Sequence, residues 1–501
     1  MVKPAGKSAP PRTEEVAPDP AAMIESMRAF GYSLPDAIAD LIDNSITAGA
    51  SLVEITLHWD GADSWIRIVD DGAGMDAGTL TNAMRLGSRN PKEVRDPDDL
   101  GRFGLGLKTA AFSQAAALTV ASRPADGGLE VRGWDLEHIG STGSWSLLFE
   151  ETAGDRPALE ALGSDATGTA VLLKRLDRLV GDAEVEDEQA KSHFLRLAEG
   201  VEQHLEVVFH RFLESGLAIN VNGSALQAWD PFLASAAATQ VLPAEQLPFA
   251  GDHVRAQPYV LPHHSRLSTE AHRAAAGIRG WNQHQGFYVY RARRLLVAGD
   301  WLGLPFQKEE HYKLARIQVD LSNAMDREWQ IDVRKATARI PRELRDELKR
   351  IADATRSRAA EAYRYRGRRI ARQANVDRSF VWSTRVNRGT VEYRIDREHP
   401  LIAQSLEGSG EGRQALERTL RVVEETLPVQ AIVMEARDRP DGDREPFAGH
   451  QREVERMLRE ALGILVEHGA RPGDALARLA GMEPFDSHPE LAAKIAEEME
   501  A

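Results

Sequence analysis

Two polar side chains one helical turn apart, Asp40 and Asn44, are of the types that activate water beside a metal ion. The segment DAIADLIDNSIT at 36–47 carries apolar residues at helical spacing, which predicts an amphipathic helix. Ser33 suits the N-cap of that helix, and Pro35 is compatible with its first turn. Because residues i and i+4 share a helix face, Asp40 and Asn44 can hold a water molecule and Mg²⁺ side by side. A solvated polar face is the alternative for this helix taken alone.

A glycine-rich turn follows two segments that alternate like strands, SLVEITLHW and WIRIVDDGAGM. The turn carries the pattern Asp70-x-Gly72-x-Gly74 at the end of the second strand. A carboxylate at a strand end can accept a hydrogen bond from an exocyclic amine such as that of adenine. The glycines allow the backbone to turn tightly against a flat base. An ordinary turn built from Asp and Gly is the alternative. We expect Asp70, and not the neighbouring Asp71, to bind the base.

A second glycine-rich run, GRFGLGLK at 101–108, precedes a predicted helix. Gly101, Gly104 and Gly106 leave backbone N–H groups and the positive end of the helix dipole open to phosphate. Lys108 either adds positive charge beside the phosphates or extends to solvent. The polar, proline-containing stretch 87–100 before this run predicts a mobile loop.

Together with ATGTAVLL at 166–173, these stretches resemble, in this order, the nucleotide-binding site of the GHKL ATPases. That superfamily contains gyrase B, the heat-shock chaperone of the same fold, histidine kinases and MutL. The run DLIDNSITAGA, next to GRFGLGLK, is most similar to bacterial MORC-like and MutL-like proteins. The resemblance is strong over about 20–180, weaker over 190–340, and absent beyond.

The resemblance implies binding of ATP and Mg²⁺ and hydrolysis of the β–γ bond. In the family, the residue that matches Asp70 binds adenine, and the threonine that matches Thr169 hydrogen-bonds near it through water. The residue at position 40 activates the attacking water, and Asn44 supplies an oxygen to Mg²⁺. A lysine on a loop of the second domain reaches the γ-phosphate, and Lys335 is the candidate here. For Thr169, the alternative is an ordinary strand threonine. For Lys335, the alternative is a surface lysine.

The chain departs from the family at the residue that activates water, which is usually Glu and here is Asp40. Asp is shorter by one methylene, and a misplacement of ~1 Å can cost ~10²-fold in rate. We therefore expect slow turnover, with a non-hydrolysing ATP switch as the alternative. Thr47 stands where MutL-like proteins often have Asp.

The composition excludes several classes of protein. The chain has 501 residues, of which 42% are apolar, and a net charge of −15. Cysteine is absent, which excludes disulfides and thiolate zinc sites. No stretch approaches the ~18 apolar residues of a membrane span, and the N-terminal segment lacks the apolar core of a secretory signal. We therefore expect a cytoplasmic protein with no membrane partner.

The expected fold class is α+β, with several domains. By resemblance, the first is a GHKL (Bergerat) ATP-binding α/β sandwich, followed by a transducer-like α/β domain and a mixed, mainly helical C-terminal region. The expected boundaries are a disordered tail at 1–20, the ATP-binding domain at 21–180, the transducer-like domain at 190–341, a basic helical segment at 342–378, and a C-terminal region of unknown role at 379–501.

The basic segment 342–378 carries twelve basic and six acidic residues in an otherwise acidic chain. Arg364, Arg366, Arg368 and Arg369 alternate there with tyrosine and suit contact with a nucleic-acid backbone, although a solvated charged face is the common alternative. The favoured function is an ATP-operated homodimeric clamp in a DNA transaction, with phage (antiviral) defence as a pathway by analogy. An ATP-switched protein-binding scaffold or chaperone is the alternative. A histidine kinase is less favoured, since no histidine precedes His58.

Overall fold

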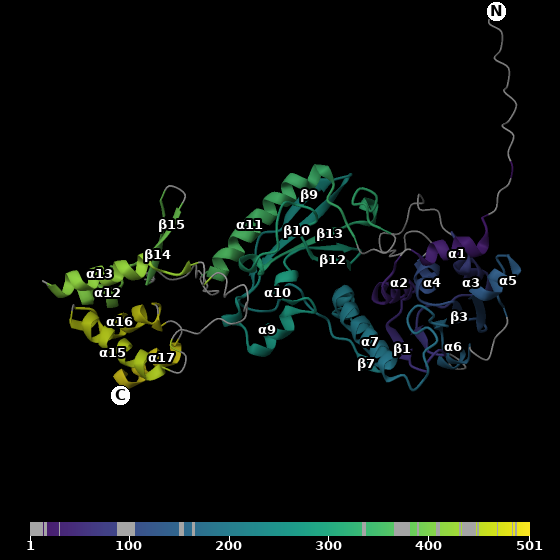
Figure 1. Ribbon diagram of the computed structural model, residues 1–501, viewed down its shortest axis with the longest axis horizontal. Helices are drawn as coiled ribbons and strands as arrows, with labels where there is room; N and C mark the ends of the chain where they lie inside the picture. The colour runs from purple at the N-terminus through teal and green to yellow at the C-terminus, as the bar shows by residue number, and fades with distance from the viewer. Residues whose placement is uncertain are drawn as a thin grey trace, which may run out of the picture. The chain divides into compact units, whose positions relative to one another are not determined.

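The computed structural model describes a chain with two compact units, Met1–Arg368 and Arg369–Ala501 (Figure 1). The described residues are 14, 18–29, 31–87, 106–149, 155–162, 166–332, 337–364, 381–387, 390–406, 411–429, 432, 447, 450–467, 469–482, 484–485 and 488–500.

A mixed sheet forms the centre of the N-terminal part of the first unit, with the strand order β4-β3-β5-β2-β1-β6-β7. Neighbouring strands are antiparallel except for β1 and β6, which pair in parallel with Leu52 opposite Ala218. The two segments expected to be strands form a hairpin, β1 and β2. The strands are β1 (Leu52–His58), β2 (Trp65–Asp70), β3 (Ala117–Arg123), β4 (Glu130–Asp135), β5 (Gly168–Lys174), β6 (Ala218–Val221) and β7 (Ser224–Ala225).

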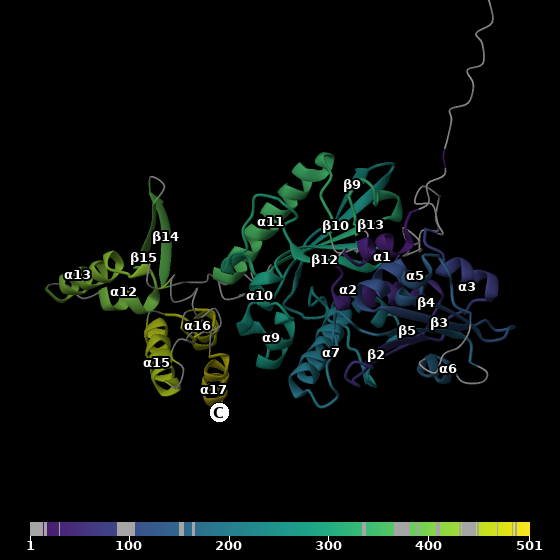
Figure 2. The same ribbon diagram turned by 45° about the vertical axis from the view of Figure 1, so that its right-hand side comes forward.

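Both faces of this sheet are covered by apolar clusters. Alternate residues of a strand point to opposite sides, so neighbouring residues belong to different clusters. Val171 and Leu173 of β5 belong to the larger apolar core, whereas Ala170 and Leu172 belong to a smaller cluster under α6. In Figure 2, α2 and α6 lie on opposite sides of the strands. The helices are α1 (Pro20–Arg28), α2 (Leu34–Thr47), α3 (Ala77–Met84), α4 (Gly106–Gln114), α5 (Leu136–Thr142), α6 (Arg156–Ala161), α7 (Glu188–Val208) and α8 (His210–Leu213).

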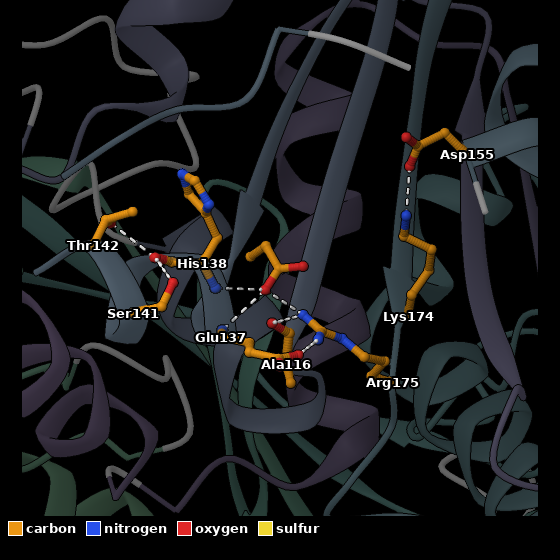
Figure 3. Close-up of polar contacts among 9 residues, drawn as sticks. Ala116, Glu137, His138, Ser141, Thr142, Asp155, Lys174 and Arg175 are labelled. Carbon is orange, nitrogen blue, oxygen red and sulfur yellow. Dashed lines mark hydrogen bonds and ion pairs between the residues drawn. The ribbon is translucent and has the colours of Figure 1, made fainter. Parts of the chain in front are cut away.

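Ion pairs join the end of β5 to the elements around it (Figure 3). Lys174 Nζ lies 2.6 Å from Oδ1 of the buried Asp155, directly before α6. Arg175 Nη2 lies 2.5 Å from Asp135 Oδ1, the carboxylate that caps α5, and Arg175 also donates to the carbonyl of Ala116. These contacts hold α5 and α6 to the sheet.

A second sheet follows in the first unit, with the order β12-β11-β13-β10-β8 and with β9 paired to β10. Strands β11 and β12 form a hairpin in this sheet. Helix α11 lies across one face of this sheet (Figure 1). The elements are β8 (Gln240–Val241), β9 (Glu245–Phe249), β10 (Asp252–Val260), β11 (Gly286–Arg291), β12 (Arg294–Asp300), β13 (Ala315–Leu321), α9 (Thr269–Ala276), α10 (Gly280–Gln283) and α11 (Arg345–Arg364). Four short 3₁₀ turns occur among the described residues at His264–Arg266, Glu310–Tyr312, Asn323–Met325 and Arg342–Leu344.

The second unit contains a hairpin and a small helical core. Its elements are β14 (Trp382–Asn387), β15 (Thr390–Ile395), α12 (Pro400–Leu406), α13 (Glu411–Glu425), α15 (Gln451–Glu467), α16 (Pro472–Leu479) and α17 (Pro489–Glu500). Its core contains Leu458, Leu479 and Phe485.

The overall α+β fold class, with a mainly helical C-terminal region, is confirmed. The first sheet nevertheless continues past residue 180, because β6 pairs with β1. Among the described helices, none is long and apolar enough to cross a membrane.

Candidate nucleotide site

Helix α2 brings the first two predicted site residues together. Ser33 caps the helix by accepting from the backbone N–H of Asp36, and Pro35 lies in its first turn, as the sequence predicts. Apolar residues of α2 pack into the main core. The side chain of Asp40 is 1% exposed, whereas Asn44, one turn further, is exposed to solvent.

Two groups from outside α2 contact the carboxylate of Asp40. The hydroxyl of Tyr32 donates to Asp40 Oδ2 at 3.0 Å. Nη2 of Arg294, the first residue of β12, lies 3.5 Å from Asp40 Oδ1, and its Nε lies 2.8 Å from Asp43 Oδ1. A Cβ placed on Gly106 would lie 3.9 Å from Asp40 Oδ2. One carboxylate oxygen therefore faces the second sheet, and the other faces the start of α4.

Tyr32 stays protonated as a hydrogen-bond donor. Burial raises the pKa of Tyr32 first, and the negative charge of Asp40 and the hydrogen bond to it raise it further. The carboxylate of Asp332 adds a smaller effect of the same sign, which places the segment just before Lys335 within electrostatic range of this site. Residues 333–336, including Lys335, lie outside the described residues.

Asn44 has the geometry to present an oxygen to a cation. Its Nδ2 donates to the backbone carbonyl of Asp40 at 3.1 Å, which leaves the amide oxygen for other partners. Among the described residues, no group of three or more His, Asp or Glu side chains could hold a metal ion. A single protein oxygen, that of Asn44, fits Mg²⁺, because in ATP sites this ion is bound by few protein oxygens together with phosphates and water.

Asp70 is fixed at the end of β2 by donors on both sides. Ser45 Oγ, from α2, donates to Oδ2 at 2.8 Å, and the backbone N–H of Gly72 donates to Oδ1 at 3.0 Å. Burial raises the pKa of Asp70, while these hydrogen bonds oppose the increase. Each carboxylate oxygen has a second lone pair, so acceptor capacity remains for an amine. Asp71 instead is exposed and accepts from the backbone of Ser51.

Thr169 lies directly opposite Asp70 in the pairing of β2 with β5. Its Oγ1 is 2.8 Å from Ser122 Oγ, and its side chain is buried. Gly74 has φ +65°, and a Cβ there would lie 2.0 Å from the carbonyl oxygen of Arg123. The turn that contains Gly72 and Gly74 is therefore pressed against the end of β3 and needs glycine at position 74.

The phosphate end of the predicted site is described only in part. Gly106 is the first residue of α4, whereas Gly101 and Gly104 lie outside the described residues, as does most of the loop expected at 87–100. Lys108 is buried, and its Nζ donates to the carbonyl of Ala83 at 2.8 Å. Burial lowers the pKa of Lys108 to about 8. Lys108 thus does not extend to solvent.

The sequence analysis missed three residues that the structure places at this site: Tyr32, Ser45 and Arg294. Ser45 follows Asn44 directly, so its position on α2 could have suggested a contact with the next motif. Nothing in the sequence pairs Arg294 with Asp40, because they belong to different elements, β12 and α2, far apart along the chain. Of the arginines proposed for nucleic acid, Arg364 is the last residue of α11, and Arg366, Arg368 and Arg369 lie outside the described residues.

Comparison with known proteins agrees with this geometry. A family model described as histidine kinase-, DNA gyrase B-, and HSP90-like ATPase matches residues 32–169. The DNA mismatch repair protein MutL of Rhodospirillum rubrum is 37% identical over 122 residues, which are 24% of this chain and 17% of that protein. MutL of Pseudomonas paraeruginosa is 26% identical over 212 residues, 38% of this chain and 33% of that protein.

MutL of Allorhizobium ampelinum is 39% identical over 92 residues, 18% of this chain and 14% of that protein. The chain spans a third or less of the length of these relatives. The family match starts at Tyr32 and ends at Thr169, so it includes α2, β2, both glycine-rich stretches and the first two residues of β5. Residues 32–169 therefore form an ATPase domain of the GHKL superfamily, similar to that of MutL proteins.

Proposed function

We propose that this chain binds ATP with Mg²⁺ and hydrolyses it slowly, and that nucleotide binding closes a homodimer acting in a DNA transaction. The observation that carries the proposal is the arrangement on α2. The buried carboxylate of Asp40 directs Oδ2 toward Gly106 at the start of α4, and the exposed Asn44 lies one turn along. ATP supplies a reactive β–γ bond, and Mg²⁺ neutralises its phosphate charge.

In this reading, the residues of the chain act by position and charge. Asp70 accepts from the adenine amine, with Ser45 and Gly72 holding its carboxylate in place. Asn44 offers its amide oxygen to the cation. Asp40 accepts a proton from the attacking water through Oδ2. Its side chain is one methylene shorter than the glutamate usual in this superfamily, so slow turnover is expected.

The first test separates binding from turnover. Asp70→Asn should abolish ATP binding measured by calorimetry, because an amide offers the amine a weaker acceptor. Asp40→Asn should bind Mg²⁺-ATP with unchanged affinity and release no phosphate, because an amide does not take up a proton. Asp71→Asn is the matched control: it removes the adjacent carboxylate, which is bound to Ser51, and should leave ATP affinity unchanged. Equal affinity of Asp70→Asn and the unsubstituted chain would contradict the assignment.

The DNA partner is supported by the excess of basic residues in segment 342–378. It is also supported by the relatives, whose names describe DNA mismatch repair. Replacing Arg364, Arg366, Arg368 and Arg369 by glutamine should flatten the log–log salt dependence of duplex binding by roughly three units, at ~0.9 per phosphate contact. The measurement is DNA affinity at several salt concentrations with a non-hydrolysable ATP analogue. An unchanged slope would favour the alternative, an ATP-switched protein scaffold. The same assay with phage DNA would address the proposed defence role.

A further inference from the structure

A buried ion pair joins the second sheet to the predicted catalytic helix. The side chains of Asp40 and Asp43 are each 1% exposed, and that of Arg294 is 4% exposed. Two carboxylates three residues apart on one helix repel each other when they are buried, and buried charges are costly unless they are paired. Arg294 supplies positive charge to both from outside the helix.

Arg294 contacts Asp43 and Asp40 through different nitrogens and at different distances. Nε and Nη2 form one edge of the planar guanidinium. The Nε end lies 2.8 Å from Asp43 Oδ1, which is a close ion pair, and the Nη2 end lies 3.5 Å from Asp40 Oδ1. Asp43 thus anchors the guanidinium, and Nη2 faces Oδ1 of Asp40. Oδ2 of Asp40 instead accepts from Tyr32 and lies on the side of Gly106.

The backbone of Arg294 is itself held against the N-terminal part of the unit. It follows a two-residue turn, Ala292–Arg293, and the side chain of Arg293 donates to Ser215 Oγ and the carbonyl of Arg211. Across the hairpin, the hydroxyl of Tyr290 lies 2.8 Å from His210 Nε2. These contacts fix the tip of the β11–β12 hairpin independently of the two aspartates, so the guanidinium is preorganised.

The interface beside this ion pair is not completely filled. A cavity of about 560 Å³ lies between α2, α7 and β12, with Asp36, His204 and Arg294 in its wall and Thr337 at its border. The cavity borders the ion pair but does not separate its groups, because Arg294 contacts both aspartates.

We infer that Arg294 is a positioning residue for Asp40: it holds Oδ1 of the carboxylate toward the second sheet and so turns Oδ2 toward the site of water attack. The inference rests on the proposed ATP hydrolysis. It makes the rate of the chemical step depend on a residue of the second sheet, with no requirement that this residue touch the nucleotide.

The central experiment measures kcat for phosphate release, together with nucleotide affinity. Arg294→Gln should lower kcat by roughly 10–100-fold, as expected for ~1 Å of misplacement, and should change nucleotide affinity less than about threefold. Arg294→Lys keeps the charge but cannot present two donors along one edge, so it should recover part of kcat. Arg291→Gln is the matched control.

Arg291 lies on the same hairpin, is equally buried, and pairs with Asp326 at 2.7 Å instead of with α2. Its replacement should lower the melting temperature as Arg294→Gln does, while leaving kcat per folded molecule unchanged. Equal losses of kcat in the two variants, or no loss in Arg294→Gln, would overturn the inference.

Asp43 supplies a second line of evidence, because Asp43→Ala removes the anchor while Arg294 itself stays in place. Asp43→Ala should lower kcat by releasing the anchor of Arg294, and the Asp43→Ala/Arg294→Gln double variant should be no slower than Arg294→Gln alone. Multiplied losses in the double variant would show that Asp43 acts separately and would overturn the inference. If the unsubstituted chain binds ATP but releases no phosphate, the proposed hydrolysis itself fails, which is a distinct result.

Discussion

At the scale of single residues, the hydroxyl of Tyr32 donates to the carboxylate of Asp40 at 3.0 Å. Tyr32→Phe removes it and leaves a buried carboxylate with one donor fewer. Since such losses cost about 1–3 kcal/mol, we expect a decrease of that size in the free energy of unfolding, measured with urea. Tyr393→Phe, at a position 39% exposed, should cost little. Equal stability of the two variants would argue against the hydrogen bond.

Lys108 gives a prediction about pH. Its pKa falls from 10.5 to about 8 on burial, so the folded chain binds fewer protons there than the unfolded chain between these values. The cost of holding Lys108 charged is therefore fully present below pH 8 and is relieved as the pH rises toward 10.5.

Lys108→Met lacks this cost at every pH. Relative to Lys108→Met, the unsubstituted chain should gain up to ~3 kcal/mol in the free energy of unfolding between pH 7.5 and pH 10. Urea titrations of both proteins at the two pH values measure the gain. A constant difference would mean that Lys108 is not held in an apolar environment.

Two kinds of sequence signal identified the candidate site residues: spacing within one predicted helix, and the order of the motifs along the chain. Asp40 and Asn44 share a helix, and Asp70 and Thr169 lie opposite each other once β2 and β5 pair. The contact of Arg294 with Asp40 depends on how the hairpin tip meets α2, and no spacing within either segment encodes it. Motif order thus identifies the residues proposed to face the nucleotide, whereas the residues that contact them from other elements are identified only from the fold.

At the scale of elements, the turn after β2 depends on glycine. Gly74→Ala would place a Cβ 2.0 Å from the carbonyl oxygen of Arg123, at φ +65°. We expect a loss of at least about 2 kcal/mol in the free energy of unfolding and weaker ATP binding, because the turn must move away from β3. Gly128→Ala, where the added Cβ meets open space, is the control. Wild-type affinity in Gly74→Ala would separate this turn from the nucleotide site.

At the scale of the whole molecule, the sequence predicts two α/β domains and ends the first at residue 180, whereas its sheet continues to β7. Strand β6 pairs in parallel with β1 through Leu52 and Ala218, and β7 follows it. Parallel pairing of distant segments leaves no local signal, unlike the short hairpin between β1 and β2. A fragment ending at residue 180 should therefore aggregate, whereas one ending at residue 225 should stay monomeric in size-exclusion chromatography. Monomeric behaviour of the shorter fragment would contradict this reading.

The same pairing has a consequence during synthesis of the protein on the ribosome. The chain emerges from its N-terminus, so β1 and β2 can form a hairpin long before β6 is made. Until then the outer edge of β1 presents unpaired backbone groups, on which a strand of another nascent chain can add. All four motifs of the proposed nucleotide site precede β6, whereas Arg294, which contacts Asp40, follows it. Neighbouring chains on one messenger RNA are therefore exposed to mispairing until Val221 has left the ribosome.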